Sequence, residues 1–266
     1  MHSYHQEFTT LSQAVHVAGR RVIQLACEGF DTFTKKDRSP VTTADLEVDQ
    51  LLRQHLLTAF PHDGWLSEET PDDLNRVDKR RIWIVDPIDG TKYFIVGLPQ
   101  FTISVALVEN GEPVMAMILN PATKELFSAI QGSGAMLNGQ SIFVRSTEEP
   151  RLTLLVNPPA LKQKTFPKLE TSIMCRPMGS IAYTLALIAA GRADATIHLG
   201  RQNEWDIAAG VLLVQEAGGS VVDTHGSPLC FNQPDPSVKG VIACRMDQAS
   251  FLQKLVRNLT NSEGSR

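Results

Sequence analysis

Two aspartates three positions apart form the part of the sequence best suited to metal chemistry. Asp86 follows an apolar run that predicts a buried β-strand, and Pro87 should prevent further regular pairing there. Asp89 and Gly90 are typical of a turn, and Gly90 allows a phosphate to approach the backbone. Mg²⁺ usually binds one or two carboxylates together with substrate phosphate and water, so the segment predicts a magnesium site. A solvated turn is the alternative that a bare Asp-Gly pair would favour.

The residues around these aspartates extend the candidate site. The Ile88 carbonyl between them adds an oxygen ligand, and Thr91 adds a hydroxyl that could cap a following helix. Upstream, a short apolar strand over 65–67 ends on Glu68 and Glu69. If that strand lies beside the strand that ends at Asp86, Glu68 converges with Asp86 and Asp89. The alternative is that this pair of acids is solvated, as paired acids usually are.

Two further acids stand at the starts of predicted helices. Asp45 begins a helix that Thr42 or Thr43 could cap, and capping alone would explain this acid. Asp206 precedes an apolar helix in the second half of the chain, where the helix dipole favours a negative charge. The sharper hypothesis places both acids beside the metal, with Asp206 closing a cleft from the other half.

Three residues are candidates for contacts to a phosphorylated substrate. Lys36 belongs to a basic loop that is either solvated or faces a phosphate. Gly179 and Ser180 precede a strongly apolar helix, and a helix N-terminus suits an anion or a hydroxyl group.

The composition is that of an ordinary globular protein, with 266 residues of which 42% are hydrophobic and 20% charged. The net charge of −4 gives no electrostatic case for binding a nucleic-acid polymer. The four cysteines are scattered without a C-x-x-C spacing, so reduced thiols are expected. The N-terminus lacks the apolar core of a signal peptide and no run is long enough to span a bilayer, so we expect a cytoplasmic protein without membrane association.

The order of predicted elements changes along the chain. Two amphipathic helices over 3–28 and 46–60 precede an antiparallel meander, which predicts an α+β half over 1–145. Strands alternate with helices over 146–266, which predicts an α/β half.

Four segments resemble the inositol monophosphatase superfamily of Mg²⁺-dependent, lithium-sensitive phosphatases. They are 83–91, 204–210, 40–45 and 67–69. The resemblance implies a layered αβαβα sandwich, in which the C-terminal half completes the active-site cleft. A homodimer is compatible with the resemblance, and no residue tests it.

The resemblance also implies a role for each matching residue. The implied metal ligands, most of which would also contact the substrate, are Glu68, Asp86, the Ile88 carbonyl, Asp89 and Asp206. Thr91 and Asp45 would activate the attacking water, with Glu68 counted among the catalytic groups. The Gly90 and Thr91 backbone would contact the phosphate.

Within the superfamily, the segments 89–95 and 197–206 look most like the CysQ branch, the 3'(2'),5'-bisphosphate nucleotidases. Leu199 stands where inositol monophosphatases usually carry an acid that touches the inositol ring, and Arg201 suits a second phosphate or is a solvated arginine. This branch implies hydrolysis of adenosine 3',5'-bisphosphate to AMP, in sulfur metabolism. The alternatives are an inositol-1-monophosphatase, more distantly a fructose-1,6-bisphosphatase, and a non-catalytic metal- or phosphate-binding protein.

Overall fold

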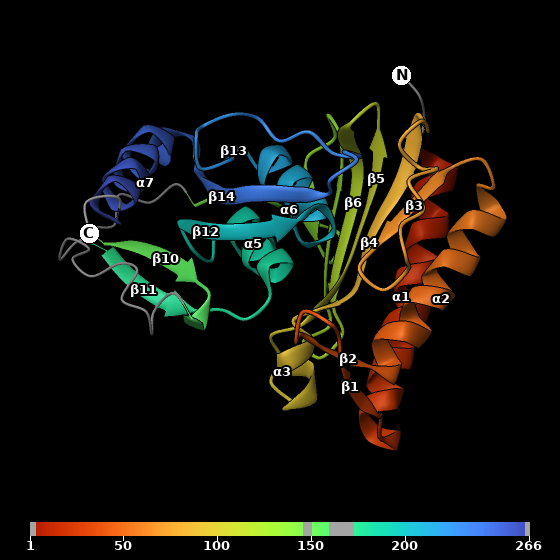
Figure 1. The fold of residues 1–266 in the computed structure, drawn as a ribbon. Helices are drawn as coiled ribbons and strands as arrows, with labels where there is room; N and C mark the ends of the chain where they lie inside the picture. The colour runs from red at the N-terminus through yellow and green to blue at the C-terminus, as the bar shows by residue number, and fades with distance from the viewer. Residues whose placement is uncertain (1–3, 146–150, 160–172, 264–266) are drawn as a thin grey trace.

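The computed structural model describes residues 4–145, 151–159 and 173–263 of the chain. Helices and sheets alternate across Figure 1 as five layers, which confirms the predicted αβαβα sandwich. The expected boundary between the two halves, at residues 145 and 146, falls at an edge of the described residues. Within the described ranges, no helix is both long and apolar enough to cross a membrane.

The first sheet has seven strands in the order β3-β4-β5-β6-β7-β8-β9. β3 is parallel to β4, and the remaining neighbours are antiparallel. The strand bounds are β3 Gly64–Ser67, β4 Arg81–Asp89, β5 Thr102–Glu109, β6 Glu112–Asn120, β7 Glu125–Ile130, β8 Ala135–Leu137 and β9 Gln140–Ile142.

Helices α1 (His5–Glu28) and α2 (Thr43–Ala59) cover the outer face of this sheet. Both carry apolar residues at helical spacing, and these pack against inward-facing strand residues such as Trp83 and Val105. A small antiparallel pair, β1 (Thr32–Thr34) and β2 (Pro40–Thr42), leads into α2.

Helices α5 (Ile181–Ala189) and α6 (Glu204–Glu216) lie between the two sheets. Both helices are apolar almost all round, because each contacts a sheet on either side. Gly210 allows them to approach closely, since a Cβ there would lie 2.4 Å from the Leu185 side chain. The two sheets therefore share one continuous core.

The second sheet has five strands in the order β11-β10-β12-β14-β13. Its outer face is covered by α7 (Ala249–Glu263), which follows the short 3-10 helix η1 (Met246–Gln248). The strand bounds are β10 Leu152–Val156, β11 Ile173–Pro177, β12 Ala195–Asn203, β13 Gly219–Val222 and β14 Ser237–Arg245.

Two strands run further than the sequence predicts. β4 continues past Pro87, because one extra residue is accommodated between the pairs Asp86–Ser104 and Asp89–Thr102. This bulge absorbs the missing proline N–H, so the expectation that pairing ends at Asp86 is wrong. The strand predicted from the apolar run over 193–199 likewise continues, because β12 extends to Asn203 after a register shift between His198 and Arg201.

Candidate active site

The ends of two parallel strands bring the first acids together. β3 pairs with β4 so that Ser67 lies opposite Val85, and the Glu68 N–H donates to the Val85 carbonyl at 3.3 Å. Glu68 therefore leaves its strand beside Asp86. The two strands are neighbours, which meets the condition for Glu68 to converge with the aspartates.

The start of α2 delivers Asp45 to the same edge. Thr42 caps the helix, and its backbone N–H donates to Asp45 Oδ2 at 2.7 Å in a capping box. The Thr91 hydroxyl lies 3.0 Å from both Asp45 Oδ1 and the Ile88 carbonyl oxygen, and its single proton serves one of them at a time. Asp45 thus completes the capping box of α2 and also contacts Thr91, while its place beside a metal stays a prediction.

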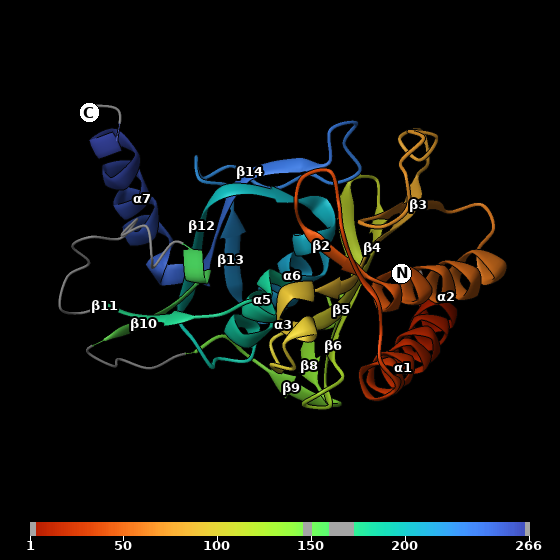
Figure 2. The same cartoon turned by 60° about the horizontal axis from the view of Figure 1, so that its bottom comes forward.

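Thr91 itself is placed differently from the expectation. Gly90, with φ +92°, precedes the short helix α3 (Thr91–Ile95) as its N-cap, and Thr91 is the first helical residue. Its hydroxyl is therefore directed to Asp45 rather than to the helix it begins. Gly90 is confined by its neighbours, because a Cβ there would lie 2.6 Å from the Gln100 carbonyl oxygen. α3 contacts β2 at this edge (Figure 2).

Asp89 is bound by the start of α5. The Ser180 hydroxyl donates to Asp89 Oδ2 at 2.5 Å, and the Ala182 N–H donates to the same oxygen at 2.6 Å. Ser180 also caps α5 by accepting from the Tyr183 N–H. Ser180 therefore holds a candidate metal ligand, while the Gly179 N–H donates to the Gln100 side chain.

Asp206 comes from the other half of the chain, in the first turn of α6. Its Oδ2 accepts the Asn203 N–H at 2.7 Å. The neighbouring Glu204 is buried and accepts the backbone N–H groups of Asn232 and Gln233 at 2.7 and 2.8 Å. These bonds fix the start of α6 against the loop before β14.

Arg76 ties that loop to the N-terminal half. Its guanidinium is buried, pairs with Asp72 at 2.7 Å, and donates to the Asn232 side chain and the Gln233 carbonyl oxygen. Arg76 and Asn232 were missed in the sequence, where no local pattern marks them. Glu204 does lie in the matching segment 204–210, although its role as an anchor is visible only in the structure.

The electrostatics show that the acids are close to one another. Burial, followed by repulsion from Glu68, Asp89 and Asp206, raises the pKa of Asp86 well above its usual range. Burial also raises the pKa of Asp89 to about 7, against the hydrogen bond from Ser180. The pKa of Asp206 is raised by burial and then by the charge of Asp89. Such a group of repelling carboxylates, with Asp86 and Asp89 buried, has the donor chemistry that a divalent cation requires.

One lysine supplies positive charge to this group. Lys35 Nζ lies 2.7 Å from both Glu68 Oε1 and Glu69 Oε1, whereas the side chain of Lys36 is exposed. Burial raises the pKa of Glu69 to about 7. Among the described residues, no three His, Cys, Asp or Glu side chains are already arranged around one metal position. A cation held by Glu68 would compete with the contact between this side chain and Lys35.

The two residues that distinguish the candidate substrates make other contacts. Arg201 is exposed and its guanidinium donates to Asp235 at 2.5 Å. Leu199 packs against the apolar core between the second sheet and α7. Neither contact involves the acids of the candidate site.

Known proteins resemble this chain over most of its length. The model of the Inositol monophosphatase family matches residues 5–262. A Nus factor SuhB from Xylella fastidiosa is 36% identical over 82% of this chain and 80% of the relative. An inositol-1-monophosphatase from Rhizobium meliloti is 37% identical over 80% of this chain and 84% of the relative. The solved structure of an IMPase from Thermotoga maritima has a TM-score of 0.83 at 29% identity, and the match covers 98% of this chain and 99% of that one. The chain therefore belongs to the inositol monophosphatase family.

Proposed function

We propose that this protein is a Mg²⁺-dependent phosphomonoesterase that hydrolyses a small phosphorylated molecule with an activated water. The observation that carries the proposal is that half-buried Asp206, from one half of the chain, lies close to buried Asp86 and Asp89 from the other. The charge of Asp206 raises the pKa of Asp86, and the charge of Asp89 raises the pKa of Asp206. Metal ions, when bound, neutralise the phosphate charge and lower the pKa of water. The proposed metal ligands are Glu68, Asp86, the Ile88 carbonyl, Asp89 and Asp206.

Thr91 and Asp45 are proposed to orient and deprotonate the attacking water. The Thr91 hydroxyl lies 3.0 Å from Asp45 Oδ1, so a proton taken from water can pass along this bond. Burial raises the pKa of Asp45 despite the hydrogen bonds from Thr42, which makes the carboxylate a stronger base. The backbone at Gly90 and Thr91, at the start of α3, is the proposed contact of the phosphate.

Inositol 1-phosphate is the leading candidate substrate. The inositol-1-monophosphatase of R. meliloti supports it, because that relative matches this chain over 80% of its length at 37% identity. Adenosine 3',5'-bisphosphate is the second candidate, favoured by Leu199 in place of an acid and by Arg201. The Arg201–Asp235 pair is exposed, and surface pairs contribute only about 0–1 kcal/mol, so a phosphate could replace Asp235.

Phosphate release from three substrates separates these candidates. Inositol 1-phosphate, adenosine 3',5'-bisphosphate and fructose 1,6-bisphosphate are compared in Mg²⁺ and in EDTA. We expect the highest kcat/KM for inositol 1-phosphate, and no effect of Arg201→Gln on it. Lys239→Gln is the matched control, because Lys239 is exposed and lies opposite Arg201 in the sheet.

Other outcomes of this assay are equally informative. A preference for adenosine 3',5'-bisphosphate that Arg201→Gln lowers tenfold, with Lys239→Gln unchanged, would support the second candidate. Mg²⁺ binding without phosphate release from any substrate would overturn the proposal in favour of a non-catalytic binding protein.

A further inference from the structure

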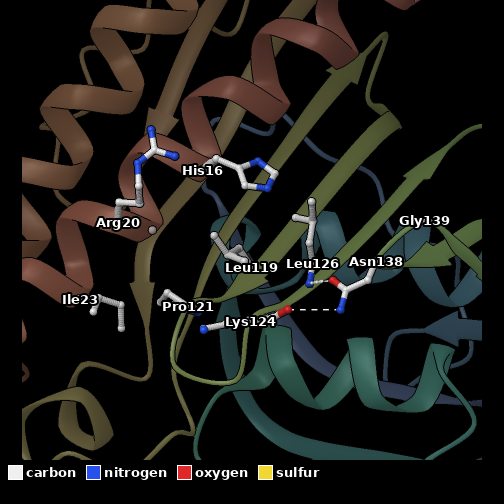
Figure 3. Close-up of a pocket in the computed structure, with 10 residues that line it drawn as sticks. His16, Arg20, Ile23, Leu119, Pro121, Lys124, Leu126, Asn138 and Gly139 are labelled. Atoms are coloured by element: carbon white, nitrogen blue, oxygen red, sulfur yellow. Dashed lines mark hydrogen bonds between the residues drawn. The ribbon is translucent and has the colours of Figure 1, made fainter.

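A cavity of about 640 Å³ lies on the outer face of the first sheet, between α1 and the connection from β6 to β7 (Figure 3). It arises because two helices cannot cover a seven-stranded sheet: α1 packs against β6, and β7 to β9 extend beyond it. α1 approaches the sheet closely at Gly19, where a Cβ would lie 2.5 Å from Leu119 Cδ2. The acids of the candidate active site do not line this cavity.

The cavity combines an apolar floor with a basic rim. The floor is formed by Ile23, Leu119, Pro121 and Leu126. The rim carries His16, Arg20 and Lys124.

The neighbouring acids do not neutralise this rim. Glu125, next to Lys124 in the chain, accepts instead from Arg192 and Tyr183. Arg21, next to Arg20, pairs with both Glu28 and Glu47 on the helix surface. Among the described residues, neither Arg20 nor Lys124 has an acidic partner.

The wall of the cavity is held in place by Asn138, in the turn between β8 and β9. Its side-chain oxygen accepts the Leu126 N–H at 2.9 Å, and its amide donates to the Lys124 carbonyl oxygen at 3.2 Å (Figure 3). Across the cavity, His16 Nδ1 donates to the Ser12 carbonyl oxygen at 2.7 Å, which orients the imidazole on α1. The basic rim is therefore borne by a defined surface.

We propose that this cavity binds an amphipathic anion, a small molecule with an alkyl or aromatic body and one acidic group. The volume falls in the range of about 300–1,000 Å³ that is usual for ligand sites. The alkyl or aromatic body would cover Leu119 and Leu126. The acidic group would lie between Arg20 and Lys124, two cations that have no acidic partner in the described part of the chain. This site is separate from the proposed phosphatase site.

Decanoate is the probe, with 1-decanol as its neutral counterpart, and binding to the full chain is measured by calorimetry. We expect one decanoate per chain and at least tenfold weaker binding in the double variant Arg20→Gln, Lys124→Asn. Asparagine suits position 124, because its φ of +59° lies in the left-handed region. Lys254→Gln, at an exposed position of α7, is the matched control and should bind decanoate normally.

A second variant tests the floor without removing basic groups. Ile23 is 38% exposed, so Ile23→Glu should fold normally while placing a negative charge in the cavity and abolishing decanoate binding. Phosphatase activity should be unchanged in all variants. Equal affinities for decanoate and decanol, or an unchanged affinity in the double variant, would overturn the proposal. So would sedimentation showing that a second copy of the chain covers this face and excludes decanoate.

Discussion

Replacing Asp89 with asparagine should stabilise the metal-free protein while removing its activity. Burial raises the pKa of Asp89 from 3.8 to about 7, with a further contribution from the charge of Glu68. A rise of this size corresponds to about 4 kcal/mol at most. The folded protein holds the proton more tightly than the unfolded chain, so stability falls as the pH rises between these two pKa values. The decrease in stability is complete above the pKa of the folded state, and the asparagine variant does not show it because its side chain does not ionise.

The free energy of unfolding is measured in urea with EDTA, at pH 8 and at pH 5.5. At pH 8 the variant should exceed wild type by up to about 4 kcal/mol, and at pH 5.5 by about half as much. Asparagine keeps the shape and an acceptor for the Ser180 hydroxyl, so the fold should remain intact while phosphate release falls by orders of magnitude. Asp78→Asn, which changes an exposed acid of the β3–β4 loop, is the control.

Magnesium provides the second half of this test. A ligand that binds only the folded state at one hundred times its Kd stabilises it by about 2.7 kcal/mol, and we expect this gain in wild type but a smaller one in the variant. If Asp89→Asn were less stable than wild type at pH 8 in EDTA, burial and repulsion would not dominate at this carboxylate. Equal stabilisation of both proteins by Mg²⁺ would remove Asp89 from the ligand set.

Three further substitutions test the neighbours of the proposed metal ligands. Thr91→Ala should lower kcat by about 10²–10⁴ with little change in Mg²⁺ affinity, because the residue contacts Asp45; equal losses of both would contradict its role in activating water. Lys35→Met should tighten Mg²⁺ binding severalfold by freeing the acids it bridges, whereas Lys36→Met, on an exposed neighbour, should leave a Mg²⁺ titration unchanged. Glu204→Gln should lower the free energy of unfolding by about 1–3 kcal/mol and weaken Mg²⁺ binding, because each backbone N–H donates to a different carboxylate oxygen and the amide nitrogen cannot replace one of them as an acceptor. An unchanged Mg²⁺ titration would show that α6 is positioned without this anchor.

The acids of the candidate site could be found in the sequence because each one ends or begins an element with a recognisable pattern. Apolar runs before Glu68 and Asp86 predict strands, and a parallel pairing then brings their ends to one edge. Asp45 and Asp206 stand at helix starts, where hydrophobic periodicity begins. The layered fold could be predicted from the resemblance. The strands β1, β8 and β9 could not be predicted, because each has only three residues and a strand so short shows little periodicity.

The sequence could not show which of two adjacent lysines contacts the acids, nor which distant residues contact each other. Lys35 and Lys36 are identical in type, and only the path of the loop decides which ammonium group contacts Glu68. The anchor formed by Arg76 and Asn232 joins residues more than 150 positions apart, so no local pattern announces it. The bulge at Pro87 could not be predicted without the partner strand. A proline that ends a strand and a proline within a bulge have the same local sequence pattern.

Helix starts explain how the fold tolerates a buried group of acids. Asp45 accepts a backbone N–H at the start of α2, Asp89 accepts one at the start of α5, and Asp206 accepts one at the start of α6. Each helix N-terminus stabilises a nearby negative charge by about 0.3–1 kcal/mol, and by up to about 2 kcal/mol when partly buried. These contributions oppose desolvation without cancelling it, as the raised pKa values show. Because α2 packs on one face of the first sheet and α5 and α6 on the other, the spacing of the acids depends on how the layers pack, and a substitution in the shared core should alter metal affinity without touching a ligand.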